Sequence, residues 1–463
     1  MKIYNALLAI CFTLISQIAT AGYTLPSYEK VTLQNGLTVI LMEQHEVPLI
    51  DVNIVVNVGA IDDANNAGLS YLTAQNLLLG TKHLSKTQLD QQIDFVGAEL
   101  YSTANLEFST IGASFAVKDT DNIMNILRDA VLFPRFDETE FNKHKSRHAL
   151  QLTQRKESPR SVINQYFNRL IFGQNGYGAV TSGDQESIKS ISLPLIQQHH
   201  SKWYTANNAA IIVVGDFETN VMKEKIKKLF SSWSSANPAL QQQDIKKTPH
   251  ASSPQVLLVN KGDARESTFL IGGKGIARNN PDIVGLSVIN TILGGRFTSW
   301  LNDELRVNAG LTYGARSRFT SYSHDGTFTI STFTKTETTI EAIDLALKTY
   351  QRLWQQGIDS ATLTSAKAYV KGQFPPKFET ASQLADLLAN MYGYGFDESY
   401  INTFEQQVDS LTIEKSQQLI NSYFPKENLQ FVVIGKAEQI RTALAKYGKI
   451  TETDIKESGF NIQ

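Results

Sequence analysis

The chain has 463 residues, of which 42% are hydrophobic and 19% are charged. This ordinary globular composition excludes a disordered protein, and the length allows two or three buried cores. The formal net charge of −2 gives no reason to expect nucleic acid or an anionic membrane as a partner.

The first residues have the pattern of a secretory signal peptide. Lys2 precedes an apolar run over residues 6–19, and the small-residue triplet "ATA" at 19–21 follows. An uncleaved membrane anchor is the alternative, but the run is shorter than the roughly 20 residues that span a bilayer. We expect residues 1–21 to be a signal peptide cleaved after Ala21. This predicts export to the periplasm of a two-membrane bacterium, or outside the cell.

The chain has a single cysteine, Cys11, which lies inside this predicted signal. The mature protein would therefore have no disulfide, and its stability must come from buried apolar surface. Removing Lys2 with the signal leaves 42 of the 43 basic residues against 45 acidic residues. Later apolar runs are short and strand-like, such as 209–214, so no transmembrane helix is expected after the signal.

Strand patterns open the mature chain. Residues 28–43 alternate around Asn35-Gly36, a strong hairpin signal, and residues 49–60 predict another strand. A further strand is expected at 109–117. Helical periodicity marks four stretches of this half, at 66–79, 86–96, 119–132 and 137–156.

Two segments of the chain recur at long range. The unit at 208–230, with a buried strand, a turn at Gly215-Asp216 and a helix, resembles the unit at 428–448, in which Gly435 takes the place of Gly215. Likewise "GLSYLTAQNLLLGT" at 68–81 resembles "GLSVINTILGG" at 285–295. A repeat of this length indicates two structurally similar domains rather than a solenoid.

The polar stretch 234–254 is rich in Ser, Gln, Lys and Pro, which is typical of a linker. We therefore expect an N-terminal domain at 22–233 and a C-terminal domain at 255–463. Strands and helices mix without regular alternation. The predicted fold class is α+β, with two similar domains that are each a mainly antiparallel sheet with helices packed on one face.

The sequence offers only weak short motifs for a metal site or a catalytic nucleophile. In "HKSRH", His144 and His148 stand at i and i+4 on one helix face, but no carboxylate accompanies them, so a solvated basic face is favoured over a metal site. The neighbours His199 and His200 point in different directions on a helix and cannot chelate as a pair. No G-x-S-x-G elbow occurs, and no cysteine remains in the mature chain.

The order of the segments resembles the pitrilysin/insulinase family of zinc peptidases, particularly the two-domain subunits of mitochondrial processing peptidase and its bacterial relatives. Residues 31–63 are similar to the family's opening hairpin and strand, and 68–85 to its active-site helix. Residues 290–317 resemble the hallmark segment of its second domain. The similarity covers about 28–445 and implies two domains that enclose a cavity.

This family's active helix carries His-x-x-Glu-His, in which two histidines bind zinc and the glutamate activates water. By resemblance, the first histidine falls on Tyr71, the base on Ala74 and the second histidine on Gln75. The third ligand, a glutamate further along the chain, falls on Gln151. These replacements leave no imidazole, thiolate or carboxylate, and an amide is a poor zinc ligand. We therefore expect no cofactor in this chain.

The family's second-domain pattern is intact as Leu305-Arg306 followed by Gly310-Leu311-Thr312-Tyr313. Local signals place Arg306 in the last turn of a helix, Gly310 just past its end and Tyr313 early on the next strand. Taken alone, Arg306 would be a helix C-terminal cation and Tyr313 a half-buried strand residue. The resemblance implies instead that the pair positions a substrate.

The leading hypothesis is a non-catalytic, substrate-positioning subunit of a periplasmic heterodimeric zinc endopeptidase. A homologous partner with His-x-x-Glu-His would hold the zinc, and Arg306 and Tyr313 would act on the peptide bound there. The alternative is a pseudopeptidase that scaffolds or binds peptides without hydrolysis. An enzyme that uses the His144/His148 face is the remaining option, but this face lacks an adjacent acid or base.

Overall fold

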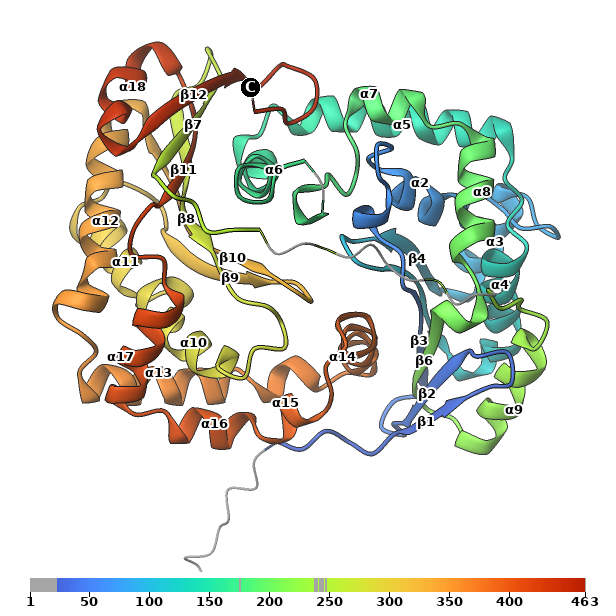
Figure 1. The fold of residues 1–463 in the computed structure, drawn as a ribbon. Coiled ribbons are helices and arrows are strands. Elements are labelled where there is room, and N and C mark those ends of the chain that lie inside the picture. Colours follow the sequence, from blue (N-terminus) through green and yellow to red (C-terminus); the bar gives the residue numbers. More distant parts are fainter. Residues whose placement is uncertain (1–22, 175, 237–239, 241–244, 246–247, 463) are drawn as a thin grey trace, which may run out of the picture.

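The computed structural model describes residues 23–462 except 175, 237–239, 241–244 and 246–247 (Figure 1). The predicted signal peptide lies outside the described residues, as does part of the predicted linker. Two six-stranded sheets, each with its own set of helices, form two similar α+β halves, which confirms the predicted fold class. Within the described part of the chain, no helix combines the length and apolar character needed to cross a membrane.

The first sheet has the strand order β1-β2-β6-β3-β5-β4. Its strands are β1 (Glu29–Thr32), β2 (Thr38–Glu43), β3 (Leu49–Val56), β4 (Glu99–Ala104), β5 (Ser109–Ala116) and β6 (Ala209–Gly215). The predicted hairpin at Asn35-Gly36 joins β1 to β2, and Gly36 adopts the left-handed φ of +82°. Strand β6 is entirely buried and pairs parallel with β2, while the other neighbours pair antiparallel.

The helices of the first half other than α6 (Pro159–Phe172) pack on this sheet or on one another. They are α2 (Leu69–Asn76), α3 (Lys86–Val96), α4 (Thr120–Leu132), α5 (Glu138–Arg155), α7 (Gln185–Ser190), α8 (Leu193–Trp203) and α9 (Thr219–Phe230). Helices α4 and α9 share one apolar core with the sheet. The helices predicted at 86–96, 119–132 and 137–156 are confirmed within two residues, whereas the helix predicted at 66–79 is shorter at both ends.

The second sheet repeats this plan with the order β12-β7-β11-β8-β10-β9. Its strands are β7 (Gln255–Asn260), β8 (Glu266–Lys274), β9 (Arg316–Ser321), β10 (Gly326–Lys335), β11 (Gln430–Gly435) and β12 (Lys449–Asp454). Strand β11 ends at Gly435 as β6 ends at Gly215, so the repeat seen in the sequence is a repeat of structure. Strand β9 is an edge strand, and the segment leading into it carries Tyr313.

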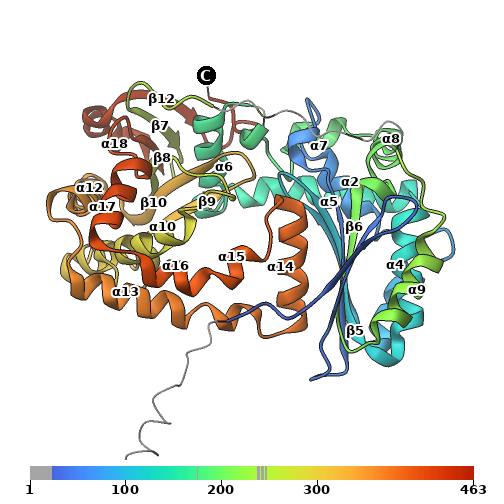
Figure 2. The ribbon, with the colours of Figure 1, turned by 60° about the horizontal axis from the view of Figure 1, so that its bottom comes forward.

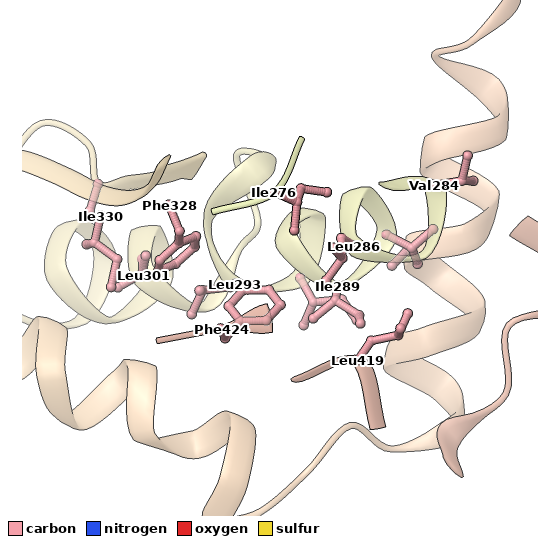
Figure 3. Close-up of a cluster of buried hydrophobic side chains, with 14 of the residues drawn as sticks. Ile276, Val284, Leu286, Ile289, Leu293, Leu301, Phe328, Ile330, Leu419 and Phe424 are labelled. Atoms are coloured by element: carbon pink, nitrogen blue, oxygen red, sulfur yellow. The ribbon is translucent and has the colours of Figure 1, made fainter. Parts of the chain in front are cut away.

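Helices of the second half lie outside its sheet. They are α10 (Ile283–Asn290), α11 (Trp300–Asn302), α12 (Thr339–Gln355), α13 (Ser360–Gly372), α15 (Ser399–Asn402), α16 (Phe404–Ser410), α17 (Ile413–Tyr423) and α18 (Ala437–Leu444). Figure 3 shows side chains of α10 and α17 meeting those of the sheet, among them Ile289, Phe328, Leu419 and Phe424. This core fixes the helical segment that precedes Arg306.

Each half also sends one helix across to the inner face of the other half's sheet (Figures 1 and 2). Helix α6 (Pro159–Phe172) packs on β8 and β11 of the second sheet. Helix α14 (Ala381–Tyr394) packs on β3 and β6 of the first sheet. The two sheets are therefore covered on both faces, and the halves share their apolar cores.

A buried carboxylate also joins the halves. Glu107, in the β4–β5 loop, is 3% exposed and accepts hydrogen bonds from the Tyr177 hydroxyl at 2.8 Å and the Ser323 backbone amide at 3.1 Å. The ring of Tyr177 stacks on Tyr322, with centroids 4.5 Å apart. The junction is therefore both polar and aromatic, and it holds the two halves in one orientation.

Candidate functional site

Helix α2, where the family resemblance places the zinc motif, is anchored from its N-terminal end. The Asp63 carboxylate accepts hydrogen bonds from the Gly68 amide at 3.0 Å and the Ser70 amide at 2.8 Å, and from the Ser70 hydroxyl at 2.6 Å. Burial raises the pKa of Asp63 to about 7 despite these hydrogen bonds, which act in the opposite direction. Leu72 and Ala74 are fully buried, so the helix is part of the first domain's core.

The four positions of the predicted degenerate zinc site offer no zinc ligands. The half-buried Tyr71 ring stacks on His148 at 4.8 Å, and Ala74 is a buried methyl group. The Gln75 amide donates a hydrogen bond to the Ser102 carbonyl of β4. Gln151 is exposed on α5, about one turn beyond His148.

This donor set does not fit zinc, because it lacks an imidazole, a thiolate and a carboxylate. Nor do the described residues contain a group of three or more His, Cys, Asp or Glu side chains that could hold a metal ion. We therefore derive no metal-dependent step from the residues of this chain.

The predicted solvated face at "HKSRH" is wrong for its histidines. His148 is 5% exposed, its Nε2–H donates to the Ser182 carbonyl at 2.9 Å, and its ring lies parallel to that of the half-buried His144 at 6.3 Å. Burial lowers the pKa of both imidazoles. Residues i and i+4 share one face of a helix, so both rings face the protein while Lys143 and Arg147 face solvent.

The structure confirms that His199 and His200 point to different places. His199 lies 3.2 Å from the Ser70 hydroxyl, whereas His200 donates to the Val131 carbonyl at 2.8 Å. Burial lowers the pKa of His200 to about 4. Both rings are thus structural side chains of the core around α2.

Burial of the His200 imidazole predicts that the stability of the protein depends on pH. Between pH 6.5 and about 4, an unfolded His200 binds a proton that the folded His200 does not, so the free energy of unfolding falls as the pH is lowered through this range. Above pH 6.5, His200 is neutral in both states, so its full contribution to the free energy of unfolding is present. We expect His200→Gln to flatten this slope by up to one proton, or about 1.4 kcal/mol per pH unit. Urea denaturation at several pH values measures the slope, with the exposed His83→Gln as the matched control. Equal slopes for the wild type and His200→Gln would contradict the assignment.

Arg306 stands on an exposed helical end in the second half. Helix α11 continues into a π-helical turn, η6 (Asp303–Asn308), and Gly310 follows it with a left-handed φ of +63°. The Leu311 amide closes this end on the Leu305 carbonyl at 2.8 Å. The predicted positions of Arg306 and Gly310 are thereby confirmed. Buried Leu305 anchors the turn and leaves Arg306 exposed.

Tyr313 lies in the loop before β9, so its predicted place on the strand is wrong. The loop is tied to β10, because the Thr332 hydroxyl donates to the Gly314 carbonyl at 2.9 Å and the Thr334 hydroxyl to the Leu311 carbonyl at 2.7 Å. These bonds hold the backbone on the sheet without forming a ladder. The Tyr313 side chain is 82% exposed and stacks on Phe333 at 6.3 Å.

Two residues that the sequence did not single out organise this loop. The Arg306 guanidinium lies 4.6 Å from the centre of the Phe297 ring, which is itself 65% exposed. The Asn302 side chain donates to the Phe297 carbonyl at 2.6 Å and accepts from the Ala315 amide at 3.3 Å. Asn302 thus connects the segment under Arg306 to the segment that carries Tyr313. The sequence offered one signal for these supporting residues, the phenylalanine in "GGRFTSW" at 294–300.

The two groups of candidate residues lie apart in this chain. In the described residues, no hydrogen bond or ring contact joins Arg306 or Tyr313 to Tyr71, Ala74, Gln75 or Gln151. Both side chains of the pair are exposed, as are Val307, which follows Arg306 in the sequence, and Phe297, whose ring contacts the Arg306 guanidinium. The pair is therefore available to a second molecule and is not committed to the helix α2 of its own chain.

Comparison with known sequences places these features in a family. The profile described as "Insulinase (Peptidase family M16)" matches residues 38–185, and "Peptidase M16 inactive domain" matches residues 190–370. The "Uncharacterized zinc protease YmxG" of Bacillus subtilis is 22% identical over 355 residues, covering 76% of this chain and 85% of that protein. The "Non-peptidase homolog YmxG" of Helicobacter pylori is 22% identical over 411 residues, covering 88% and 93%.

Solved structures agree with the sequence relatives in fold. A peptidase M16 inactive domain from Pseudomonas fluorescens superposes with a TM-score of 0.82 at 22% identity, covering 88% of this chain and all but 2% of that one. A protease from Helicobacter pylori superposes with a TM-score of 0.78 at 22% identity, covering 89% and 100%. The two M16 family models, which match residues 38–185 and 190–370, include both α2 and the segment of Arg306 and Tyr313. The chain therefore belongs to the insulinase family, peptidase family M16.

Proposed function

We propose that this chain is the non-catalytic, substrate-positioning subunit of a heterodimeric zinc endopeptidase. The observation that carries the proposal is the contrast between its two candidate sites. The positions of the zinc motif hold Tyr71, Ala74 and Gln75, which are packed within the first domain, whereas Arg306 is exposed on a helical end and Tyr313 is exposed in the loop that follows. A chain with the second feature but not the first can assist peptide cleavage only together with another chain.

The chemistry of the exposed pair suits a peptide carbonyl. A guanidinium donates several hydrogen bonds from a planar fork, and a phenol donates one more. Donors aimed at an oxygen on which charge develops stabilise the transition state more than the ground state. Arg306 cannot act as a general base, and no carboxylate or imidazole contacts either side chain in the described structure. The activated water must therefore come from the partner.

The relatives support a paired arrangement. Helicobacter pylori has both the "Non-peptidase homolog YmxG" and the "Zinc protease PqqE", and each is 22% identical to this chain over more than 400 residues. We infer a partner of the second kind, homologous to this chain and carrying His-x-x-Glu-His. With the expected signal peptide at residues 1–21, we place the complex in the periplasm.

Zinc analysis of the isolated chain tests this division of labour. After chelation and dialysis against zinc, we expect the mature chain to retain no stoichiometric zinc by atomic absorption and to cleave no peptide. The same treatment of a homologous chain with His-x-x-Glu-His serves as the positive control. Stoichiometric zinc together with cleavage by the isolated chain would refute the proposal.

A scaffold without a hydrolytic role is the second reading of the same features. A scaffold could have the same helix α2, but it would not need Arg306 and Tyr313 to be exposed. If affinity purification from the native cell recovers no zinc-motif homologue, and no mixture cleaves peptides, the scaffold is the better account.

A further inference from the structure

The second half contains a cavity that neither site described above uses. It has a volume of about 710 Å³ and is lined by residues of α10, β9 and the crossing helix α14, among others. Aromatic side chains form much of its wall, including Phe374, Tyr394, Phe396 and Tyr400. Its size is within the range of ligand-binding pockets.

Three cations line this cavity, from three different elements: Arg278, Arg318 and Lys377. Among the described residues, none of them forms an ion pair or a side-chain hydrogen bond with a carboxylate. One carboxylate, Asp386, also lines the cavity and accepts a hydrogen bond from the Asn53 side chain at 3.0 Å. The lining therefore has an excess of two positive charges.

Arg278 is held in place although it lacks an anionic partner. Its guanidinium lies 4.8 Å from the ring centres of both Phe396 and Tyr400, and its backbone amide donates to the Tyr322 carbonyl at 2.7 Å. Partial burial and then the charge of Arg278 lower the pKa of Lys377. Both cations line the same cavity, so an anion bound between them would offset their mutual repulsion.

Several neutral polar side chains of the lining already have partners within the chain. Asn290 donates to the Ser317 carbonyl at 3.0 Å, Ser287 to the Val284 carbonyl at 2.7 Å, and Asn390 to the Asp386 carbonyl at 2.8 Å. Among the described residues, no carboxylate pairs with the three cations of the lining, so the cavity favours a negatively charged group over a neutral one.

The surrounding segment extends this positive surface. All five arginines from 278 to 318 lack an ion pair in the described structure: Arg278, Arg296, Arg306, Arg316 and Arg318. Arginines elsewhere, such as Arg352 and Arg441, pair with glutamates at 3.4 Å and 2.6 Å. The charge of these unpaired cations favours the approach of an anionic chain to this part of the protein.

We propose that the cavity binds an acidic segment of a peptide, with one carboxylate between Arg278 and Lys377 and a second at Arg318. The aromatic walls receive the apolar side chains of the same segment. This inference rests on the proposed function in taking a peptide as the ligand, and it adds that the preferred peptides are acidic. Its site is separate from the Arg306 and Tyr313 pair, so binding can be measured without catalysis.

The test is fluorescence anisotropy of labelled decapeptides with the isolated mature chain. One peptide carries Asp and Glu, and its control carries Lys at the same positions with the same aromatic residues. We expect the acidic peptide to bind more tightly, and the binding to weaken as salt is raised. Arg278→Gln, Arg318→Gln and Lys377→Gln should each weaken binding roughly tenfold, since each removes a charge-assisted contact.

Two further variants control for the loss of a charge outside the cavity and for the loss of the planar guanidinium. Arg147→Gln removes an exposed cation of α5, outside the cavity, and should leave binding unchanged. Arg278→Lys keeps the charge without the planar fork and should recover part of the affinity lost in Arg278→Gln. Thermal unfolding of each variant verifies that it is folded.

Three outcomes would overturn the inference. These are equal affinity for the acidic and basic peptides, unchanged binding by the triple variant, and inorganic phosphate binding as tightly as the acidic peptide. The proposed function fails in a different way. Suppose that acidic peptides bind through the three cations but that no mixture with a zinc-motif partner cleaves them. The proposed binding site would then be supported, and the proposed role as a peptidase subunit would be refuted.

Discussion

Replacing Arg306 by alanine in the assembled complex is expected to lower kcat/KM for peptide cleavage roughly a hundredfold, because loss of one donor to a developing oxyanion has this order of effect. The guanidinium is exposed and rests on the Phe297 ring, so its removal leaves no buried group unpaired. The loss should therefore appear in turnover while folding and assembly remain intact. Steady-state kinetics, with size-exclusion chromatography of the complex, measure both.

Nearby substitutions serve as controls for this result. Val307→Ala removes an exposed side chain from the same helical turn and should leave kcat/KM nearly unchanged. Tyr313→Phe keeps the ring stacked on Phe333 and removes only the hydroxyl, so a decrease with this variant assigns the effect to the hydrogen bond. If Arg306→Ala and Tyr313→Phe cleave as fast as the wild type, the pair has no role in positioning substrate.

Replacing Phe167 by alanine is expected to lower the free energy of unfolding by about 3–5 kcal/mol, the usual cost of removing a buried phenylalanine. Phe167 lies on α6, is 1% exposed, and belongs to a core shared with Leu257, Leu270 and Val432 of the second sheet. The substitution leaves a cavity between the halves, so it tests the crossing of α6 directly. Equilibrium denaturation in urea is the measurement.

Phe95→Ala provides the matched control, because the Phe95 side chain is 90% exposed on α3. Its change in unfolding free energy should stay within about 0.5 kcal/mol. A similarly small effect for Phe167→Ala would mean that α6 does not pack stably on the second sheet. A loss confined to the first of two separate transitions would show that the halves unfold independently.

Local chemistry explains what could be predicted from the sequence. Asn35-Gly36 specified the β1–β2 hairpin because Gly36 accepts a positive φ without strain. The matching Gly215 and Gly435 located the ends of β6 and β11, and hence the two-domain repeat. Gly310 marked the end of the helix that carries Arg306. Each of these signals depends on only a few neighbouring residues, so it can be recognised in the sequence without knowledge of long-range contacts.

The crossing helices could not be predicted in the same way. Periodicity shows that α6 and α14 have apolar faces, but not which sheet covers those faces. Both pack on the sheet of the opposite half, and this choice depends on contacts hundreds of residues apart along the chain. His148 was misjudged for the same reason, since its burial depends on Tyr71 and Ser182 rather than on its basic neighbours.

The resemblance could point to candidate residues but not to the side chains that support them. The resemblance pointed to Arg306 and Tyr313, and the structure holds them on the surface of one loop region. Their supports are Asn302, Phe297 and Phe333, which come from three segments that meet only in the fold. Tyr313 was expected early on the strand that follows Gly310, yet hydrogen bonds from Thr332 and Thr334 hold residues 311–314 as a loop before β9.

Titration of a zinc-motif partner with this chain tests the central claim most directly. Peptide cleavage is measured at a fixed concentration of the partner while the mature chain is added. We predict little cleavage by either chain alone, and activity that rises with the added chain and saturates at one equivalent. The Arg306→Ala chain should saturate at the same equivalence with far lower activity. A partner that is fully active alone and unaffected by this chain would contradict the account.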